Sequence, residues 1–392
     1  MNPVFPHLDE EEKFLYGCLA IQHRLGYAGF TQLLEVLRSP RAVYETSPEE
    51  LKVIYPRLLP ESAESIRRGP NRASWEKILD RCRKINARIV APGLLEYPEP
   101  LLSLNAPPPL LFMQGSWTKL DARAVAIVGT RHPTDYGRKA AFTLAQDLAR
   151  TNVTIVSGLA VGIDAEAHSG ALDTGRTLAV IGCGLDIPYP PENQLLRERI
   201  VEGGAVFSEF PPGAQPKRDH FPRRNRILSA LAKTTVVIEA GRRSGALLTA
   251  GHARSQGKPI FAMPGSVFSP MSSGTHALLK RDALLATSVE DVLSVVDGGC
   301  RGVSRHAPTT APTITPTIPA PNEPVLDLWR NDDTCGLDRL AERARETNLW
   351  PAGKALAALM ESLLLLEIRG LVQRLPGPVF RKTVPRGMLA TR

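Results

Sequence analysis

The densest group of positive side chains in the chain lies in residues 215–226. One acid, Asp219, and one aromatic ring, Phe221, accompany five basic residues, which are Lys217, Arg218, Arg223, Arg224 and Arg226. The apolar run 227–231 follows at once and predicts a loop that leads into a helix. A helix start offers free backbone N–H groups and guanidinium groups offer forked donors, so the window suits successive phosphates. The ring suits an unpaired base, but a solvated basic loop is the alternative, and only the fold decides between them.

Residues 124–296 alternate short, β-branched apolar runs with segments of helical length. Continuous apolar strands separated by helices are typical of a parallel sheet that is covered on both faces. The predicted strands are Ala124–Val128, Thr154–Val156, Thr177–Ile181, Ala205–Phe207, Thr235–Ile238, Pro259–Ala262 and Ala283–Ala286, preceded by Arg88–Val90 and Leu110–Met113. The sequence therefore predicts an α/β fold with an extended parallel sheet at its centre.

In an open sheet of this kind, ligands bind beyond the carboxyl ends of the strands. Polar residues and glycines follow the first, second and fifth predicted strands of the 124–296 region. After the first strand come Gly129, Thr130 and Arg131, after the second Ser157 and Gly158, and after the fifth Arg242, Arg243, Ser244 and Gly245. Glycines let the backbone approach a ligand, and helix starts supply N–H donors. Each turn alone also fits tight loop packing. Together with residues 215–226, which follow the fourth strand, they predict a positive trough.

Enzymatic interpretations find less support in the sequence. Gly182-x-Gly184 lacks the third glycine of a dinucleotide fingerprint, and no phosphate-binding loop with a GxxxxGK[ST] pattern occurs. Asp164 and His168 are spaced to share a helix face, but a first-turn Asp with a packing His is the commoner arrangement, and two ligands do not make a metal site. Ser157 and Glu239 lack a matched catalytic partner. We expect no cofactor, no metal and no catalytic residue.

Composition sets the broad class of protein. The formal net charge of +8 favours a polyanionic partner, and 43% hydrophobic residues fit a soluble globular protein. We find no apolar run long enough to span a membrane and no export signal, so we expect a cytoplasmic protein without membrane contact. The 5 cysteines are scattered without a CxxC pair, which predicts neither a disulfide framework nor a zinc site.

Residues 1–87 read as a separate domain of short helices, of the small helical type found in SAM-like and helix-hairpin-helix domains. Ser47 to Glu50 has the form of a capping box with proline at the first helical position, and another helix is predicted at 74–86. Residues 9–12 begin the first helix with acids, so packing or partner contact is favoured over DNA binding.

Residues 298–324 are rich in proline and threonine and predict a semi-extended linker. Beyond it, 325–392 predict two helices, at 336–347 and 351–369, and then a hairpin, which is a winged-helix-like outline. The second helix is dominated by leucine and carries Glu361 and Glu367, so contact with protein is favoured over reading of duplex DNA.

Several separated strings resemble the DNA-processing protein A (DprA/Smf) family. The similarity covers about residues 94–296, roughly half of the chain, and the flanking domains fit the family layout more loosely. The strings are 125–131, 155–164 with 167–168, 184–190 with Asn193, 208–209, 221–227, 239–240, 244–250 and 264–265.

The resemblance implies an extended Rossmann-like domain over residues 88–297 that needs no nucleotide cofactor. It implies binding of single-stranded DNA, formation of a homodimer through this domain, protection of incoming DNA and loading of the RecA recombinase during natural transformation. Arg131 would contact phosphate, Phe221 would stack on a base, and Arg218, or Lys217 in its place, would add a basic contact.

The resemblance also implies roles for the remaining residues of the site. Arg224 and Arg226 belong to the family's Arg-Asn-Arg motif at the helix start, and Asn225 between them would fix the turn. Backbone donors would line the pocket at Ser157, Gly158, Ser244 and Gly245. The predicted nucleic-acid-binding set is completed by Gly129, Thr130 and Arg223.

A competing hypothesis is a nucleotide-processing hydrolase of the lysine-decarboxylase-like group, which uses the same type of sheet. Members of that group carry paired glutamates after a glycine-rich loop. Here the comparable strand end, residues 239–245, has arginines in place of the acidic pair. The sequence therefore favours a DNA-binding protein over a hydrolase.

Overall fold

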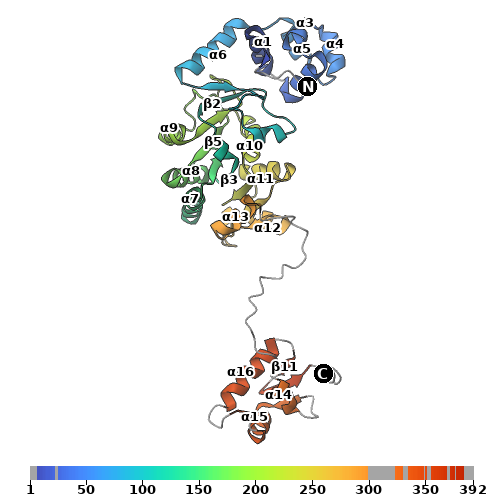
Figure 1. Cartoon of the computed structure of the whole chain (residues 1–392), viewed down its shortest axis with the longest axis vertical. Helices are drawn as coiled ribbons and strands as arrows, with labels where there is room; N and C mark the ends of the chain where they lie inside the picture. The colour runs from blue at the N-terminus through green and yellow to red at the C-terminus, as the bar shows by residue number, and fades with distance from the viewer. Residues whose placement is uncertain are drawn as a thin grey trace. The chain divides into compact units, whose positions relative to one another are not determined.

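The computed structural model describes residues 7–22, 25–298, 323–329, 334–347, 349–350, 355–368, 371–375 and 377–383. It separates into two compact units, Met1–Gly302 and Val303–Arg392 (Figure 1). Within the described ranges, no helix is both long enough and apolar enough to cross a membrane. Most of the predicted linker, and residues 351–354 and 369 of the last predicted helix, lie outside the described residues.

A nine-stranded sheet forms the centre of the first unit, in the order β1-β2-β6-β5-β4-β3-β7-β8-β9. The strands from β6 to β9 are parallel, and β1 and β2 add an antiparallel extension at one edge. Their bounds are β1 Arg88–Val90, β2 Leu111–Gly115, β3 Ala124–Val128, β4 Thr154–Ser157, β5 Thr177–Ile181, β6 Ala205–Ser208, β7 Thr234–Val237, β8 Ile260–Ala262 and β9 Leu284–Leu285. The predicted α/β fold with a Rossmann-like sheet is confirmed.

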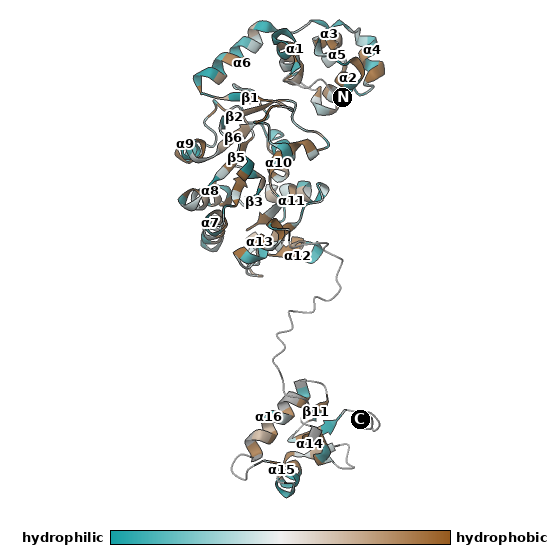
Figure 2. Cartoon of the chain, viewed as in Figure 1, coloured by the Kyte–Doolittle hydropathy of each residue, from teal (hydrophilic) through white to brown (hydrophobic). Residues whose placement is uncertain are grey.

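Successive side chains of a strand point to opposite faces of the sheet, and here they are apolar on both faces. Helices therefore cover both faces. Val125 and Ile127 of β3 join a core with α7, α8 and α13, whereas Ala126 and Val128 join a core with α10, α11 and α12. Figure 2 shows the central strands in the colour of hydrophobic residues. The bounds are α7 Asp135–Arg150, α8 Ile163–Thr174, α9 Gln194–Gly203, α10 His220–Leu231, α11 Gly245–Ser255, α12 Ser273–Arg281 and α13 Val289–Val296.

The strand order reverses at β3. From β3 the chain steps outward through β4, β5 and β6 on one side, and it then returns to place β7 on the other side. In open α/β sheets such a switch point leaves a crevice between the two loops that leave the carboxyl ends of the central strands. The loops after β3 and β7 therefore bound the natural ligand site of this fold.

In the described part of the chain before the sheet, six helices pack around their own apolar core. They are α1 Glu10–Ala20, α2 Gly26–Leu37, α3 Pro40–Glu45, α4 Pro48–Ile54, α5 Pro60–Arg67 and α6 Arg72–Lys84. The predicted capping box is present at the start of α4, where Ser47 and Glu50 exchange hydrogen bonds. Arg81 of α6 forms an ion pair with Asp186 at 2.9 Å and so ties these helices to the sheet region. The SAM-like classification and the boundary at residue 87 stay predictions.

The second unit contains short helices and a three-stranded antiparallel sheet in the order β10-β12-β11. The two predicted helices and the hairpin are present, and β10 is a strand that the sequence reading did not anticipate. Winged-helix classification and protein contact stay predictions. The bounds are α14 Glu323–Leu326, β10 Thr334–Gly336, α15 Leu337–Glu346, α16 Ala355–Ile368, β11 Val372–Leu375 and β12 Val379–Lys382.

Candidate nucleic-acid interface

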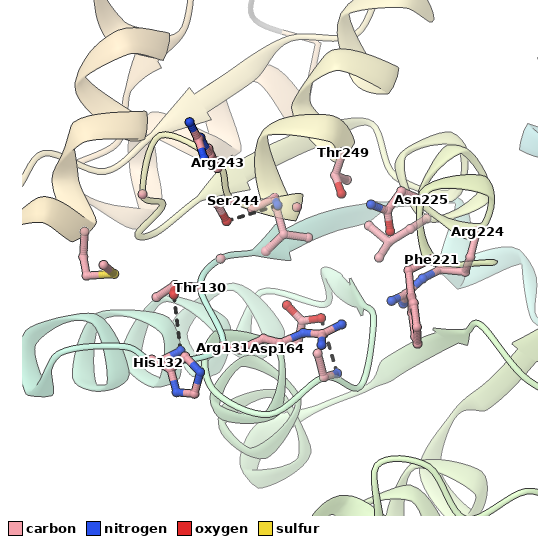
Figure 3. Close-up of a pocket in the computed structure, with 18 residues that line it drawn as sticks. Thr130, Arg131, His132, Asp164, Phe221, Arg224, Asn225, Arg243, Ser244 and Thr249 are labelled. Carbon is pink, nitrogen blue, oxygen red and sulfur yellow. Dashed lines mark hydrogen bonds between the residues drawn. The ribbon is translucent and has the colours of Figure 1, made fainter. Parts of the chain in front are cut away.

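A cavity of about 450 Å³ lies at the switch point, between the loops after β3 and β7 and the first turns of α10 and α11. We call it the switch-point trough. Figure 3 shows Arg243 and Ser244 on one wall, Thr130 and Arg131 on the opposite wall, and Phe221 with Arg224 and Asn225 at one end. The predicted site residues that line it are Gly129, Thr130, Arg131, Phe221, Arg224, Asn225, Ser244 and Gly245.

Hydrogen bonds within the two loops fix the walls of the trough. Thr130 donates its backbone N–H to the Glu239 carbonyl at 2.8 Å, which joins the loop after β3 to the loop after β7. A Cβ at Gly129 would lie 2.5 Å from Ile163, so helix packing requires glycine there. A Cβ at Gly245 would meet nothing within 4 Å, so the start of α11 faces open space. Gly245 thus leaves room for a ligand to approach the helix N-terminus.

Two exposed arginines supply positive charge on the walls of the trough. Arg131 and Arg243 line opposite walls, and neither forms an ion pair among the residues that the structure describes. The Arg131 guanidinium lies 5.3 Å from the centre of the Phe221 ring. Forked donors without a carboxylate partner are available to phosphate oxygens. Each of the two walls can therefore hold a phosphate.

The Phe221 ring is half-buried and sits in the wall that separates the trough from a second cavity of about 190 Å³. Tyr189 packs against it at a centroid distance of 5.8 Å, and a Cβ at Gly182 would lie 3.0 Å from its edge. The ring is held by these neighbours but is not sealed in the core. A base that enters either cavity can stack against it.

Arg224 does not lie on the rim, where the sequence reading placed it. It is 5% exposed, and its guanidinium donates to the carbonyl of Val180 and fills the space beside Gly158, where a side chain would clash. Burial lowers the pKa of Arg224 to about 10, and the nearby Asp164 opposes this shift. The guanidinium still carries its charge at neutral pH and makes the floor of the trough positive.

Arg223 and Arg226 are also not free. Both pair with the buried carboxylate of Glu209, Arg223 at 3.1 Å and Arg226 by a shorter contact, and Arg226 also donates to the carbonyl of Ala106. Of the five basic residues that the sequence grouped together, only Lys217 and Arg218 are exposed without a carboxylate partner in the described part of the chain, and they do not line the trough. The five basic residues of 215–226 are therefore not gathered in the trough as free cations, and their predicted roles in DNA binding stay predictions.

The backbone donors predicted at Ser157 and Gly158 are not available to a ligand. Ser157 is fully buried, and its hydroxyl donates to the Ile127 carbonyl at 2.6 Å across the sheet. The Gly158 N–H donates to Asp164 at 3.2 Å, and Gly158 lines only the smaller cavity. Both residues brace the sheet edge beneath the trough.

The helix pair Asp164 and His168 does not form a dyad. The His168 Nδ1 lies 2.7 Å from the hydroxyl of Thr177 on β5, and burial, with the charge of Arg224, lowers the pKa of His168 to about 3. Asp164 accepts from two backbone N–H groups and faces the trough, and burial raises its pKa. His168 is a packing residue, as the commoner arrangement predicts.

The residues that line the trough and that sequence reasoning missed include His132, Thr249 and Met271. His132 directly follows the predicted Arg131, and Thr249 lies one turn after Gly245 on α11, so both could have been found by helix and loop spacing. Met271 comes from the loop after β8, and nothing in its local sequence marks it.

Comparisons with known proteins agree with these observations. Residues 88–297 match the family described as DNA recombination-mediator protein A. Protein Smf of Synechocystis sp. is 34% identical over 335 residues, which cover 78% of this chain and 83% of that protein. DNA processing protein DprA of Streptococcus pneumoniae is 43% identical over 199 residues, which cover 50% of this chain and 70% of that protein.

A solved structure shows the same fold. The X-ray structure of DNA processing protein A from Streptococcus pneumoniae aligns with a TM-score of 0.62 at 33% identity and covers 73% of this chain and 98% of that chain. The family match covers more than half of the residues, and the similarity to Smf extends over most of both chains. The chain therefore belongs to the DNA recombination-mediator protein A family.

Proposed function

We propose that the chain binds single-stranded DNA in the switch-point trough and acts as a recombination mediator without catalysis. The observation that carries the proposal is the placement of two unpaired arginines, Arg131 and Arg243, on facing walls with the Phe221 ring at the end. Phosphates bind the guanidinium groups and the open N-terminus of α11, and a base stacks on the ring.

The position of the ring favours a single strand over a duplex. Phe221 lies in a wall between two cavities, so only a base with a free face can reach it. In a duplex both faces of each base are covered by its neighbours, and extrusion of a base costs a few kcal/mol. A single strand has unpaired bases, so it can bind without the free-energy cost of extruding a base.

The carboxylates near the trough support a non-catalytic role. Glu239 accepts from the backbone N–H of Thr134 at 2.9 Å and from its hydroxyl at 2.6 Å, which fixes the start of α7. Asp164 is held by its own loop. Among the residues that the structure describes, neither is paired with a second acid in the manner of the hydrolase alternative. Incubation with nucleoside monophosphates checks this directly, and release of free base would favour the hydrolase.

The finer parts of the proposal rest on the family. We propose that a homodimer in the cytoplasm protects incoming DNA during natural transformation and loads RecA onto it. Relatives named DNA processing protein DprA support a role in DNA processing, which is the general part of this proposal. A RecA filament-assembly assay on DNA coated with a single-strand-binding protein tests it, with added protein expected to shorten the lag.

An electrophoretic shift assay tests binding itself. Single-stranded and duplex DNA of equal length are compared at two salt concentrations. We expect tighter binding of the single strand and a loss of affinity as salt rises, because phosphate contacts release counterions. Equal affinity for both forms, or binding that ignores salt, would contradict the proposal.

A further inference from the structure

The loop between β8 and α12 presents an aromatic ring almost entirely to solvent. Phe268 is 92% exposed and its neighbour Val267 is 79% exposed. Single exposed apolar residues are common and need no explanation by themselves. Phe268 needs an explanation because of the loop that carries it and because of where this loop lies.

The loop that carries Phe268 is held firmly in place. Met271 accepts from the backbone N–H of Ala240 at 2.7 Å, and Gly274 donates to the Ala240 carbonyl at 2.7 Å. At the other end of the loop, the hydroxyl of Tyr136 donates to the Pro264 carbonyl at 2.7 Å. Phe268 is therefore displayed from a fixed platform, which lowers the entropic cost of stacking against it.

The same loop is continuous with the switch-point trough. It leaves the carboxyl end of β8, which is the edge of the sheet where the trough lies, and Met271 lines the trough. It is bonded through Ala240 to the loop that carries Arg242 and Arg243, both of which are exposed. A positively charged surface thus connects the trough with the Phe268 platform.

The two rings lie beside different strands of the sheet. Phe221 packs against Gly182, directly after β5, and Phe268 follows β8, so four strand spacings separate their positions in the sheet. At about 4.8 Å per spacing these strand ends are roughly 19 Å apart along the sheet edge, which corresponds to about six stacked nucleotides at ~3.4 Å each. One strand of moderate length can reach both.

We propose that Phe268 is a second base-stacking site for the DNA strand that occupies the trough. The inference rests on the proposed function and extends it: bases stack at Phe221 and Phe268, and the arginines between them hold the intervening phosphates. Charge complementarity and continuity with the trough favour a nucleic acid over a second copy of the chain as the occupant of this loop.

Phe268→Ala tests the proposal, with Val267→Ala as the matched control in the same loop. We expect Phe268→Ala to weaken binding of long oligo-dT by about 5- to 150-fold, which is the range for loss of one base–aromatic stack. Binding by Val267→Ala stays at the wild-type level. With oligo-dT too short to reach both rings, the difference between Phe268→Ala and wild type disappears.

A spectroscopic variant gives an independent readout. Phe268→Trp keeps a stacking ring, so it should retain wild-type affinity, and its added fluorescence should be quenched when oligo-dT binds. Unchanged affinity in Phe268→Ala together with unquenched Phe268→Trp would overturn the inference. So would a change in sedimentation of Phe268→Ala without any change in DNA affinity, because that result assigns the ring to a contact between copies.

These outcomes separate the inference from the function on which it rests. If wild-type protein does not bind oligo-dT, the proposed function fails. If wild type binds and Arg131→Ala weakens binding while both Phe268 variants behave as wild type, only the second stacking site fails.

Discussion

Arginines near the trough divide into those that are free to meet a ligand and those that are committed to the protein. Arg131 and Arg243 face the cavity with no carboxylate partner in the described residues, whereas Arg226 is paired with Glu209 and Arg224 is buried. Free and committed guanidinium groups should respond differently to mutation. The free ones affect DNA affinity and its salt dependence, and the committed ones affect stability.

Arg131→Ala should weaken binding of oligo-dT and make the slope of log affinity against log salt less steep by about 0.7, the value for one phosphate contact on a single strand. Fluorescence anisotropy at several salt concentrations measures both. Arg150→Ala is the matched control, because Arg150 ends α7 and does not line the trough. Its guanidinium pairs with Asp147 at 2.7 Å. An Arg131→Ala slope equal to that of wild type would show that Arg131 does not contact phosphate.

Arg226→Ala should lower the free energy of unfolding by about 1–3 kcal/mol, because it leaves the buried Glu209 carboxylate and the Ala106 carbonyl short of a donor. Urea denaturation measures this loss. The salt slope of DNA binding should stay close to that of wild type, in contrast to Arg131→Ala. A flattened slope with unchanged stability would mean that Arg226 leaves Glu209 to bind phosphate.

Substitutions at Gly129 and Gly245 distinguish a glycine needed for packing from one that leaves room for a ligand. Gly129→Ala should destabilise the fold, because the new methyl group would lie 2.5 Å from Ile163. Gly245→Ala meets no protein atom within 4 Å, so stability should be unchanged while DNA affinity falls if the strand passes close to the start of α11. Thermal unfolding and oligo-dT binding of both variants check the pair, and full affinity in Gly245→Ala would place the strand elsewhere.

At the scale of elements, α10 positions the end wall of the trough. Its first turns carry Phe221, Arg224 and Asn225, and its last carbonyls are bonded by Lys258, whose Nζ donates to Ala230 at 2.5 Å and to Ala232 at 2.6 Å. A cation at a helix C-terminus satisfies carbonyls that would otherwise lack donors. The helix is therefore anchored at the end opposite to the ligand.

The packing of α8 against β5 should make the protein sensitive to acid. The unfolded chain takes up a proton at His168 below pH 6.5, whereas the folded protein does so only near pH 3, so stability falls as pH drops between these values. At pH 5 the loss from this group is about 2 kcal/mol. Urea denaturation at pH 7 and pH 5 should show a smaller decrease in His168→Asn than in wild type. Asp164 is present in both proteins, so the comparison isolates the effect of His168. Identical decreases in stability in the two proteins would contradict the account.

The elements were predictable where local sequence decides them. β3 and β5 begin and end where their β-branched runs do, and α4 begins at its capping box, because neighbouring residues set these features. The committed arginines were not predictable in the same way. Arg224 bonds to Val180 and Arg226 to Ala106, and only the folded sheet brings such distant residues together.

At the scale of the whole molecule, one sheet edge gathers the features that the function requires. The switch point supplies the crevice, the loops after β3 and β7 supply free cations, and α10 supplies a ring held in the wall. Family membership is consistent with this arrangement, but a fold can serve many functions, so the site carries the argument.

The central claim is that free arginines hold the phosphates while Phe221 stacks on an unpaired base. The most direct test measures the affinity of wild type and Phe221→Ala for oligo-dT and for an abasic strand of the same length. The account predicts that Phe221→Ala costs about 1–3 kcal/mol on oligo-dT and almost nothing on the abasic strand, because only the first offers a base to the ring. Equal losses on the two strands, or no loss on either, would contradict it.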